Sequence, residues 1–324
     1  MQPPLPIDIA IAGLGKIARD QHVPAIRADA RFRLVATASP QDTLPDVPGY
    51  ASLAQLQAAQ AGVAAVSVCT TPQVRFEVAS LALAGGSHVL LEKPPCATLG
   101  EVESLVALAA RQGVTLLAAW HSRFAGGVEP ARAWLAGRRI QRVAVRWKED
   151  VRKWHPGQLW IWQAGGMGVF DPGINALSIL THLLPGPLRV RSAELRVPAN
   201  CETAIAATLA LEGEAGVGVA CEFDFRHVGE ECWDIDVHTD SGLLQLSQGG
   251  AVLRIDGRPV QVPAGTEYAR AYDHFARLVA AGASDVDVAP LRIVADALLC
   301  GRPVEVEPFV DDAAAAGGRH AGTR

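Results

Sequence analysis

From residue 7 to about residue 124, short apolar runs alternate with longer amphipathic stretches. The runs have the length of strands buried on both faces, and the stretches between them have helical length and spacing. This β-α-β alternation predicts a doubly wound parallel sheet. The predicted strands are 7–12, 33–38, 63–69, 89–91 and 114–119, and the predicted helices include 53–61, 74–84 and 99–111.

The pattern changes after residue 140, where apolar residues tend to alternate in twos. Such alternation is typical of an antiparallel sheet with one covered face. The predicted strands are 143–147, 193–197, 204–211, 217–225, 233–237, 243–246 and 252–253. Two amphipathic stretches, 268–281 and 290–299, are expected to be helices packed at the edge of this sheet or back against the first domain.

The pattern therefore predicts two domains: an α/β Rossmann domain over 1–124, and an α+β domain with an open, mostly antiparallel sheet over 125–310. The tail 311–324 is rich in Ala and Gly and is expected to be disordered. A free outer sheet face would suit a homo-oligomer, either a dimer or a tetramer.

The composition is that of a globular protein, with 324 residues of which 49% are hydrophobic and 19% charged. A net charge of −5 without a basic block argues against a nucleic-acid partner. No apolar run reaches the roughly 18 residues of a membrane span, and no secretory signal is recognised, so a cytoplasmic location without a membrane partner is expected. The six cysteines lack zinc spacing, and we predict no metal site.

The first predicted strand leads into Gly13-Leu14-Gly15-Lys16-Ile17-Ala18, the G-x-G-x-x-A form of the dinucleotide fingerprint. The first glycine permits a tight turn, the second lets a pyrophosphate approach, and the alanine lets the helix pack on the strand. An ordinary glycine turn is the alternative. The candidate cofactor contacts are Gly13, Gly15, Lys16, Ile17, Ser39, Thr70, Thr71, Pro72, Glu92 and Lys93.

The second predicted strand ends at Ser39, where a cofactor without a 2′-phosphate usually meets an acidic residue. A serine does not repel the phosphate, but no adjacent arginine binds it, because Pro40 and Gln41 follow. We therefore expect use of both NAD and NADP. Thr70, Thr71 and Pro72 end another strand and can line the cofactor, although a polar cap of the next helix explains them equally well.

Lys93 follows a buried strand and precedes two prolines, which cannot extend a sheet ladder. The lysine is therefore held at a carboxyl strand end, where ligands bind in parallel α/β sheets. A solvated lysine before a Pro-Pro turn is the alternative.

The second domain holds four tryptophans between residues 147 and 162, beside charged residues. Aromatic faces next to hydrogen-bonding groups suit a sugar, and core tryptophans beside a solvated charge run are the alternative. Asp171 and Pro172 suit the N-cap and first position of a helix that runs to residue 184. Asp171 and Asn175 would then share one helix face, as a base and a hydrogen-bonding anchor.

Gly13-Leu14-Gly15, Glu92-Lys93-Pro94 and the stretch 165–175 occur in the order found in the glucose-fructose oxidoreductase, inositol dehydrogenase and MocA (Gfo/Idh/MocA) family, which the chain resembles. The resemblance implies a catalytic set of Lys93, Asp171 and position 175, where asparagine replaces the usual histidine. Further motifs around residues 120–123, 146–158 and 170–178 resemble bacterial L-arabinose and D-galactose 1-dehydrogenases.

This resemblance implies oxidation of an aldose at C1 to a lactone, with NADP or NAD as acceptor. We assign Asp171 as the base, Lys93 as the group that holds O1 and relays its proton, and Asn175 as an anchor. Candidate substrate contacts are His121, Glu149, Trp154 and His155. The alternatives are another dehydrogenase of the family, such as one acting on inositol or a diol, or a sensor that binds a dinucleotide without turnover.

Overall fold

The computed structural model describes residues 5–59 and 62–310, which form two compact units. The first unit extends to Phe124 and takes up the later segment Gly265–Val288; the second unit holds Ala125–Ala264 and the chain from Ala289 onward. The prediction that 125–310 is one unbroken domain is therefore wrong for the segment 265–288. The predicted disorder of 311–324 concerns residues outside the described range.

The first unit is built on a parallel sheet with strand order β3-β2-β1-β4-β5-β6. The chain runs outward from β1 through β2 to β3, and then returns to β4 on the other side of β1. This reversal makes the carboxyl ends of β1 and β4 the place where such a sheet binds a ligand. The strands are β1 (Ile7–Ala12), β2 (Phe32–Ala38), β3 (Gly49–Tyr50), β4 (Ala65–Val68), β5 (His88–Glu92) and β6 (Leu116–Ala119).

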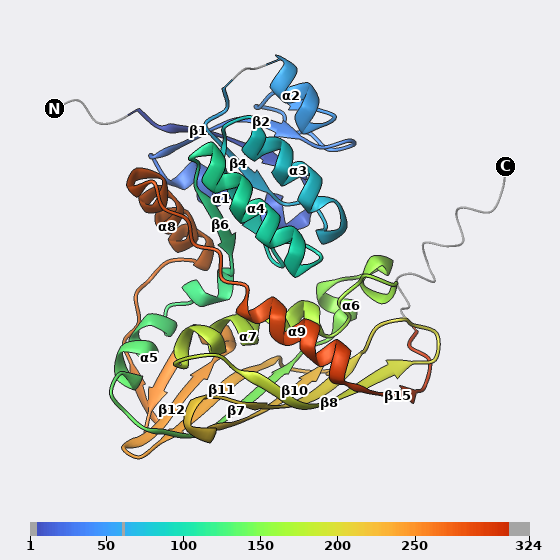
Figure 1. Cartoon of the computed structure of the whole chain (residues 1–324), viewed down its shortest axis with the longest axis vertical. Helices are drawn as coiled ribbons and strands as arrows, with labels where there is room; N and C mark the ends of the chain where they lie inside the picture. Colours follow the sequence, from blue (N-terminus) through green and yellow to red (C-terminus); the bar gives the residue numbers. More distant parts are fainter. Residues whose placement is uncertain (1–4, 60–61, 311–324) are drawn as a thin grey trace. The chain divides into compact units, whose positions relative to one another are not determined.

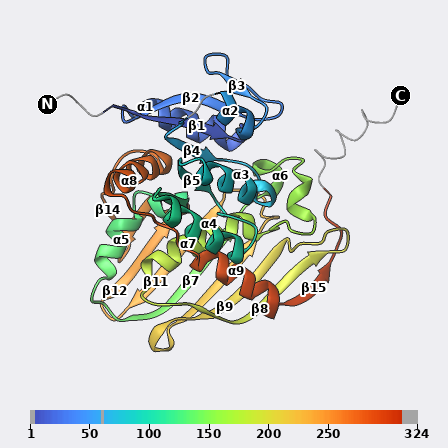
Figure 2. The ribbon, with the colours of Figure 1, turned by 45° about the horizontal axis from the view of Figure 1, so that its top comes forward.

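Helices cover both faces of this sheet, as Figures 1 and 2 show. α3 and α4 pack together on one face, and α1 and α8 pack together on the other. A π-helical turn, η1, precedes α1. The helical elements of this unit are η1 (Ala18–His22), α1 (Val23–Ala28), α2 (Leu53–Ala59), α3 (Pro72–Ala84), α4 (Leu99–Gln112), the 3₁₀ turn η2 (His121–Phe124) and α8 (Glu267–Ala281).

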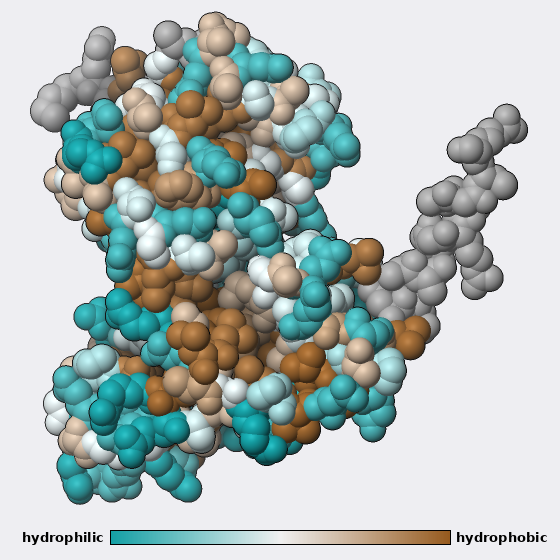
Figure 3. Space-filling view, turned by 45° about the vertical axis from the view of Figure 1, so that its right-hand side comes forward, coloured by the Kyte–Doolittle hydropathy of each residue, from teal (hydrophilic) through white to brown (hydrophobic). Residues whose placement is uncertain are grey.

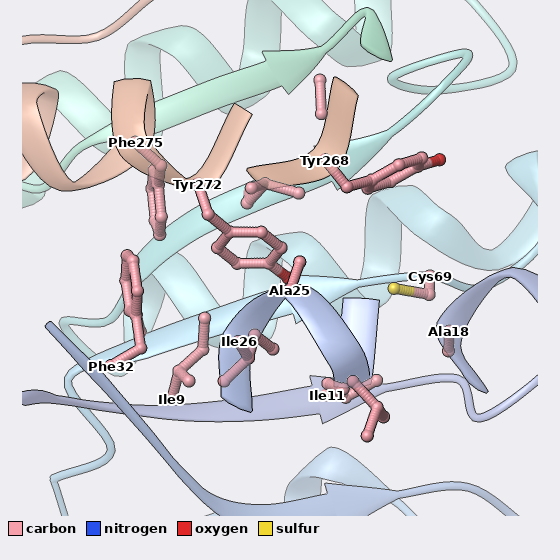
Figure 4. Close-up of a cluster of buried hydrophobic side chains, with 14 of the residues drawn as sticks. Ile9, Ile11, Ala18, Ala25, Ile26, Phe32, Cys69, Tyr268, Tyr272 and Phe275 are labelled. Carbon is pink, nitrogen blue, oxygen red and sulfur yellow. The ribbon is translucent and has the colours of Figure 1, made fainter. Parts of the chain in front are cut away.

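The α8 helix belongs to the core of the first unit because its apolar face is buried against β1 and β2 (Figure 4). Tyr272 and Phe275 are fully buried, and the ring of Phe275 stacks on Phe32 with 6.2 Å between centroids. The amphipathic pattern of 268–281 predicts the helix correctly. Periodicity alone does not identify the sheet against which such a helix packs.

The second unit contains a sheet with strand order β14-β13-β12-β11-β7-β10-β9-β8-β15. Neighbours are antiparallel except for the pairs β10 with β7 and β15 with β8, so the predicted mostly antiparallel sheet is confirmed. The strands are β7 (Ile140–Lys148), β8 (Arg189–Pro198), β9 (Ala206–Glu212), β10 (Gly218–Asp224), β11 (Cys232–Thr239), β12 (Gly242–Ser247), β13 (Val252–Ile255), β14 (Arg258–Val260) and β15 (Arg302–Val306).

Helices α5, α7 and α9 cover one face of this sheet (Figure 2). On β7, Val143, Val145 and Trp147 are buried, whereas the alternate residues Arg146 and Lys148 are partly exposed. Ion pairs join these cations to neighbouring strands, at 2.9 Å to Asp236 and 2.7 Å to Glu222. The helical elements are α5 (Val128–Leu135), α6 (Val151–Trp154), η3 (Leu159–Trp162), α7 (Phe170–Leu183), η4 (Glu214–Gly216), η5 (Gln248–Gly250) and α9 (Ala289–Cys300).

The sequence does not predict β14 and β15, which are the two edge strands of the second sheet. Each is short and contains a proline, Pro259 in β14 and Pro303 in β15. Proline lacks a backbone donor and is tolerated only where the ladder is open on one side. Proline argues against a strand in the sequence, but the edge position of β14 and β15 accommodates it.

Hydrophobic residues reach the surface in several patches on the face shown in Figure 3. Because more than half of a typical protein surface is apolar, scattered patches of this kind need no special explanation. Over the residues that the structure describes, no helix combines the length and the apolar character of a membrane span.

The packing of α8 predicts that Phe275→Ala lowers the free energy of unfolding by about 3–5 kcal/mol, the usual result of removing a buried ring. Leu299→Ala is the control, because that side chain on α9 is 85% exposed. Urea denaturation measures both. If Phe275→Ala increases the hydrogen-exchange rate of the Ile9 amide more than that of the Leu209 amide, relative to wild type, the loss of stability lies in the first unit. A loss below about 1 kcal/mol would contradict the burial of α8 there.

Candidate active site

The turn after β1 brings the carboxyl ends of β1 and β4 into close contact. Gly13 has φ +88°, a left-handed conformation, and a Cβ there would lie 2.8 Å from the backbone nitrogen of Thr70. At Gly15, by contrast, a Cβ would meet no heavy atom within 4 Å. Gly13 is therefore required by the fold, whereas Gly15 leaves space beside the start of the helix. Ala18 is fully buried, as the fingerprint predicts.

This space fits a dinucleotide. Thr70 Oγ1 is buried and has no hydrogen-bond partner among the described residues, so a bound ligand could satisfy it. Thr71 occupies the N-cap of α3, with Pro72 as the first helical residue, but its side chain makes no capping hydrogen bond. The capping explanation is therefore weaker than the sequence indicates, and contact of these residues with a cofactor stays a prediction.

The loop after β2 meets two arginines from the first helical segment. Arg19 pairs with Asp42 at 2.9 Å, and Arg27 pairs with Asp46 at 2.7 Å. Arg19 is not among the predicted cofactor contacts, because η1 brings it to this loop from a part of the chain 20 residues before Ser39. Lys16 is exposed and pairs with Asp20 on its own helix. Ile17 is also 37% exposed.

Lys93 stands directly after β5, as predicted, and its main chain is held on both sides. Arg75 from α3 donates to the carbonyl of Glu92 at 2.7 Å and also to the carbonyl of Pro94. The same guanidinium donates to the carbonyl of Thr70, so it joins the ends of β4 and β5. Arg75 is 3% exposed, and the Lys93-Pro94 peptide is cis.

Arg75 is a site residue that the sequence reasoning missed. It lies on the buried face of α3, in register with Pro72, Ala79 and Ala82. An arginine on an otherwise apolar helical stripe is the signal that could have identified it, because a buried charge needs dedicated partners.

Glu92 is 2% exposed, and its carboxylate points into the first unit. One oxygen accepts hydrogen bonds from His22 at 2.9 Å and from Tyr268 at 2.6 Å. The other accepts the backbone N–H of Lys93 at 2.9 Å. The carboxylate therefore organises its own strand end, and contact between Glu92 and a cofactor stays a prediction.

His121, a predicted substrate contact, lies in η2 after β6. Its Nδ1 is 2.6 Å from Glu267, and its ring stacks on Tyr268 with 5.3 Å between centroids. The side chain is 17% exposed. His121 is thus connected through Tyr268 to the strand end that carries Lys93.

In the second unit, the start of α7 carries the other predicted catalytic residues. The helix begins at Phe170, with Val169 at the N-cap, so the prediction that Asp171 is the N-cap is wrong. Asp171 lies in the first turn, where the helix dipole favours its negative charge. Its carboxylate meets a histidine from another segment: Oδ2 lies 3.3 Å from Nε2 of His155.

Asn175 lies one turn after Asp171 and is half-buried, although every other residue from 170 to 180 is buried. A polar residue that alone reaches the surface of a buried helix face is well placed to contact a ligand. The glycine-rich turn before α7 fixes this arrangement: a Cβ at Gly168 would lie 2.3 Å from the carbonyl oxygen of Ala204.

The tryptophans form a cluster rather than a single surface. Trp147 is buried and stacks on Trp233 at 6.0 Å, while Trp154 is 39% exposed and tilts onto Trp233 at 5.5 Å. Glu149 is 5% exposed and accepts the indole N–H of Trp233 at 2.8 Å. Trp233 lies on β11, directly opposite Trp147, and sequence reasoning missed it because cross-strand pairing is not visible locally.

The predicted site residues thus form two groups, one on each unit. The first unit brings together the glycine turn, Thr70, Glu92 and Lys93. The second unit brings together Asp171, His155 and the exposed edge of Asn175. Within the described part of the chain, no group of three or more His, Cys, Asp or Glu residues could hold a metal ion.

Comparison with known proteins adds to this description. The Gfo/Idh/MocA family model, an oxidoreductase family with an NAD-binding Rossmann fold, matches residues 7–119. A galactose 1-dehydrogenase from Pseudomonas fluorescens is 49% identical over 306 residues, which cover 94% of this chain and 99% of that protein.

Solved structures agree in fold. The D-galactose-1-dehydrogenase protein from Rhizobium etli has a TM-score of 0.92 and 52% identity, covering 96% of this chain and 100% of that one. The 3-ketoreductase KijD10 from Actinomadura kijaniata, in complex with NADP and TDP-benzene, has a TM-score of 0.80 at 20% identity and covers 93% of this chain and 99% of its own. At that identity it shares the fold alone.

The two fingerprint glycines predict separable effects. Gly13→Ala should lower the free energy of unfolding by about 1–3 kcal/mol, because the new methyl group meets Thr70 at a left-handed φ. Gly15→Ala should leave stability within about 0.5 kcal/mol but raise the dissociation constant for NAD⁺ roughly tenfold or more, about 1.4 kcal/mol. Denaturation and cofactor titration measure the two effects. Equal stability losses in both variants would contradict the assigned roles.

Proposed function

Because this chain belongs to the Gfo/Idh/MocA family of oxidoreductases, we propose that it is an aldose 1-dehydrogenase. It oxidises the C1 hydroxyl of D-galactose and L-arabinose to the lactone. The observation that carries the proposal is the near-complete coverage of two galactose 1-dehydrogenases at 49% and 52% identity. The two sugars share the stereochemistry of their ring hydroxyls and differ at C5, which supports use of both.

The cofactor, when bound, supplies nicotinamide C4 as the acceptor of the C1 hydride. The remaining task is removal of the hydroxyl proton, which we assign to Asp171. His155 lies 3.3 Å from this carboxylate and orients it, so an imidazole stands beside the base although position 175 is asparagine. Asn175 cannot titrate and anchors a substrate hydroxyl by hydrogen bonding.

Lys93 holds O1 of the sugar and relays its proton. Its backbone is fixed by Glu92 and Arg75, which sets the point from which the side chain extends. His121, Glu149 and Trp154 contact the sugar ring or its hydroxyls. The partly exposed indole of Trp154 supplies an apolar face for the ring C–H groups.

The enzyme uses both NAD and NADP. Ser39 leaves room for a 2′-phosphate, and Arg19 beside Asp42 supplies a cation at the same loop. Asp42 neutralises part of that charge, which is consistent with dual use rather than a strong NADP preference.

The substrate class is tested by initial rates with D-galactose, L-arabinose, D-glucose, D-xylose and myo-inositol, each with NAD⁺ and NADP⁺. Fast reduction with the first two sugars alone is expected. Turnover of myo-inositol instead would favour another dehydrogenase of the family. Tight cofactor binding without turnover of any compound would favour a sensor.

The catalytic assignment predicts that Lys93→Met and Asp171→Asn each lower kcat by about 10²–10⁴-fold, the usual contribution of a general acid or base. The dissociation constant for NAD⁺ should stay within about twofold in Asp171→Asn, and the circular dichroism of both variants should match that of wild type, which shows that they are folded. His182→Asn, at the opposite end of α7, is the control and should retain full activity. Near-normal turnover in both catalytic variants would remove the assignment.

The role of Arg19 predicts that Arg19→Met lowers the ratio of kcat/KM for NADP⁺ to that for NAD⁺ by roughly tenfold, because a charge-assisted hydrogen bond to a phosphate is worth about 1.5–3 kcal/mol. Arg27→Met is the matched control, since it breaks a similar ion pair with the same loop. An equal change of the ratio in both variants would contradict the assignment.

A further inference from the structure

A buried polar cluster lies behind the strand end that carries Lys93. His22, in the π-helical turn η1, is fully buried, and its Nε2 lies 2.9 Å from Glu92. Its Nδ1 lies 2.8 Å from the hydroxyl of Tyr272 and 3.0 Å from that of Ser67. Tyr268 donates to the same oxygen of Glu92. We call these five residues the His22 cluster.

The charge state of the cluster follows from its contacts. Burial by itself lowers the pKa of His22, but Cys69, Tyr272 and the hydrogen bond to Glu92 outweigh it and raise the pKa well above its usual range. For Glu92 burial acts in the opposite direction and raises the pKa. The hydrogen bond and charge of His22 outweigh this effect, so the pKa of Glu92 is lowered. The lowered pKa of Glu92 describes an imidazolium–carboxylate pair, and the raised pKa of His22, which Cys69 and Tyr272 increase more than Glu92 does, has the direction that such a pair requires.

The hydrogen-bond pattern agrees with this pair. An imidazolium donates from both ring nitrogens, and both find acceptors here: the carboxylate of Glu92 at Nε2, and the hydroxyl oxygens of Tyr272 and Ser67 at Nδ1. Tyr272 can in turn donate to Ser67 at 3.0 Å. Each donor thus has an acceptor within hydrogen-bond distance.

A buried ion pair is weak support for stability, because desolvating two charges costs about as much as their attraction returns. A structural explanation of the cluster is therefore incomplete. Its geometry offers another explanation: the carboxylate that His22 and Tyr268 hold through Oε1 uses Oε2 to bind the backbone N–H of Lys93. This carboxylate at the N–H and Arg75 at the carbonyl together fix the orientation of the Glu92–Lys93 peptide.

We propose that His22 is a positioning residue of the active site, which acts through Glu92 to fix Lys93. It touches neither substrate nor cofactor. Its loss lets the Glu92 carboxylate turn and the Lys93 ammonium group leave the position needed for proton relay. A displacement of about 1 Å at a reacting group can cost roughly 10²-fold in rate. The inference rests on the proposed function, in which Lys93 holds O1.

A pH dependence follows from the raised pKa of His22. The groups that face it are Ser67 and Cys69 from β4, Glu92 from β5, and Tyr268 and Tyr272 from α8. A histidine with a raised pKa in the folded state stabilises fully below its unfolded pKa of about 6.5 and loses this contribution as pH rises toward the folded pKa. The stability difference between wild type and His22→Gln should therefore narrow above about pH 6.5.

The test measures kcat, KM and NAD⁺ binding for His22→Leu and His22→Gln, with the sugar that wild type oxidises. We expect His22→Leu to lower kcat by about 10²-fold with NAD⁺ binding unchanged. Glutamine retains a donor for Glu92 and should restore kcat to within about tenfold of wild type. Tyr268→Phe and Tyr272→Phe are a matched pair on α8. Tyr268→Phe removes the hydroxyl that donates to Glu92, so it should lower kcat more than Tyr272→Phe.

A second readout does not need turnover. Hydrogen exchange at the Lys93 amide should accelerate at least tenfold in His22→Leu and Tyr268→Phe, while exchange at Leu90 in the same strand stays unchanged. Wild type that reduces no cofactor with any sugar would overturn the proposed function, and this exchange measurement would still decide the role of His22. Unchanged Lys93 exchange, or a kcat per folded molecule equal to wild type in His22→Leu, would overturn the inference alone.

Discussion

The end of β5 is the constraint on which the first unit depends. The main chain of Lys93 is held between the carboxylate of Glu92 and the guanidinium of Arg75, and both groups are buried. Arg75 also binds the carbonyl of Thr70, so the strand end that carries the lysine is tied to the one that lines the glycine turn. The glycine turn and Lys93 are thereby joined through hydrogen bonds, and Tyr268 of α8 adds a further bond to Glu92 from a distant part of the sequence.

In the second unit, the start of α7 holds Asp171, as the end of β5 holds Lys93 in the first unit. The turn at Gly168 packs directly against the carbonyl of Ala204, in the chain that leads into β9. Asp171, in the first turn of α7, lies 3.3 Å from His155. The family resemblance leads one to expect a histidine at position 175, one turn along α7 from Asp171. In this chain the imidazole beside Asp171 is that of His155, which comes from a different segment. Although residue 175 is an asparagine, the Asp171 carboxylate still has an adjacent imidazole, that of His155.

Patterns within a short stretch of sequence predict the features that depend only on neighbouring residues. The alternation of apolar runs, the glycine fingerprint and the prolines after Lys93 predict strands, a tight turn after β1 and a strand end, and these are confirmed. The roles of Arg75, His22 and Trp233 depend on partners 17, 70 and 84 residues away and, for His22 with Tyr272, 250 residues away. Such contacts leave no periodic signal. The pattern left both placements of α8 open for the same reason, since an amphipathic helix fits either sheet, and the domain boundaries did not assign 265–288 to the first unit.

The central claim, oxidation at C1 of an aldopyranose, is tested most directly by isotopic transfer. D-galactose deuterated at C1, and in a separate reaction at C3, is incubated with the protein and NAD⁺, and the reduced nicotinamide is analysed by mass spectrometry. With the C1-labelled sugar one deuterium should appear at nicotinamide C4, and with the C3-labelled sugar none should. Transfer from C3 would contradict the central claim and would make the chain a dehydrogenase of a different ring carbon.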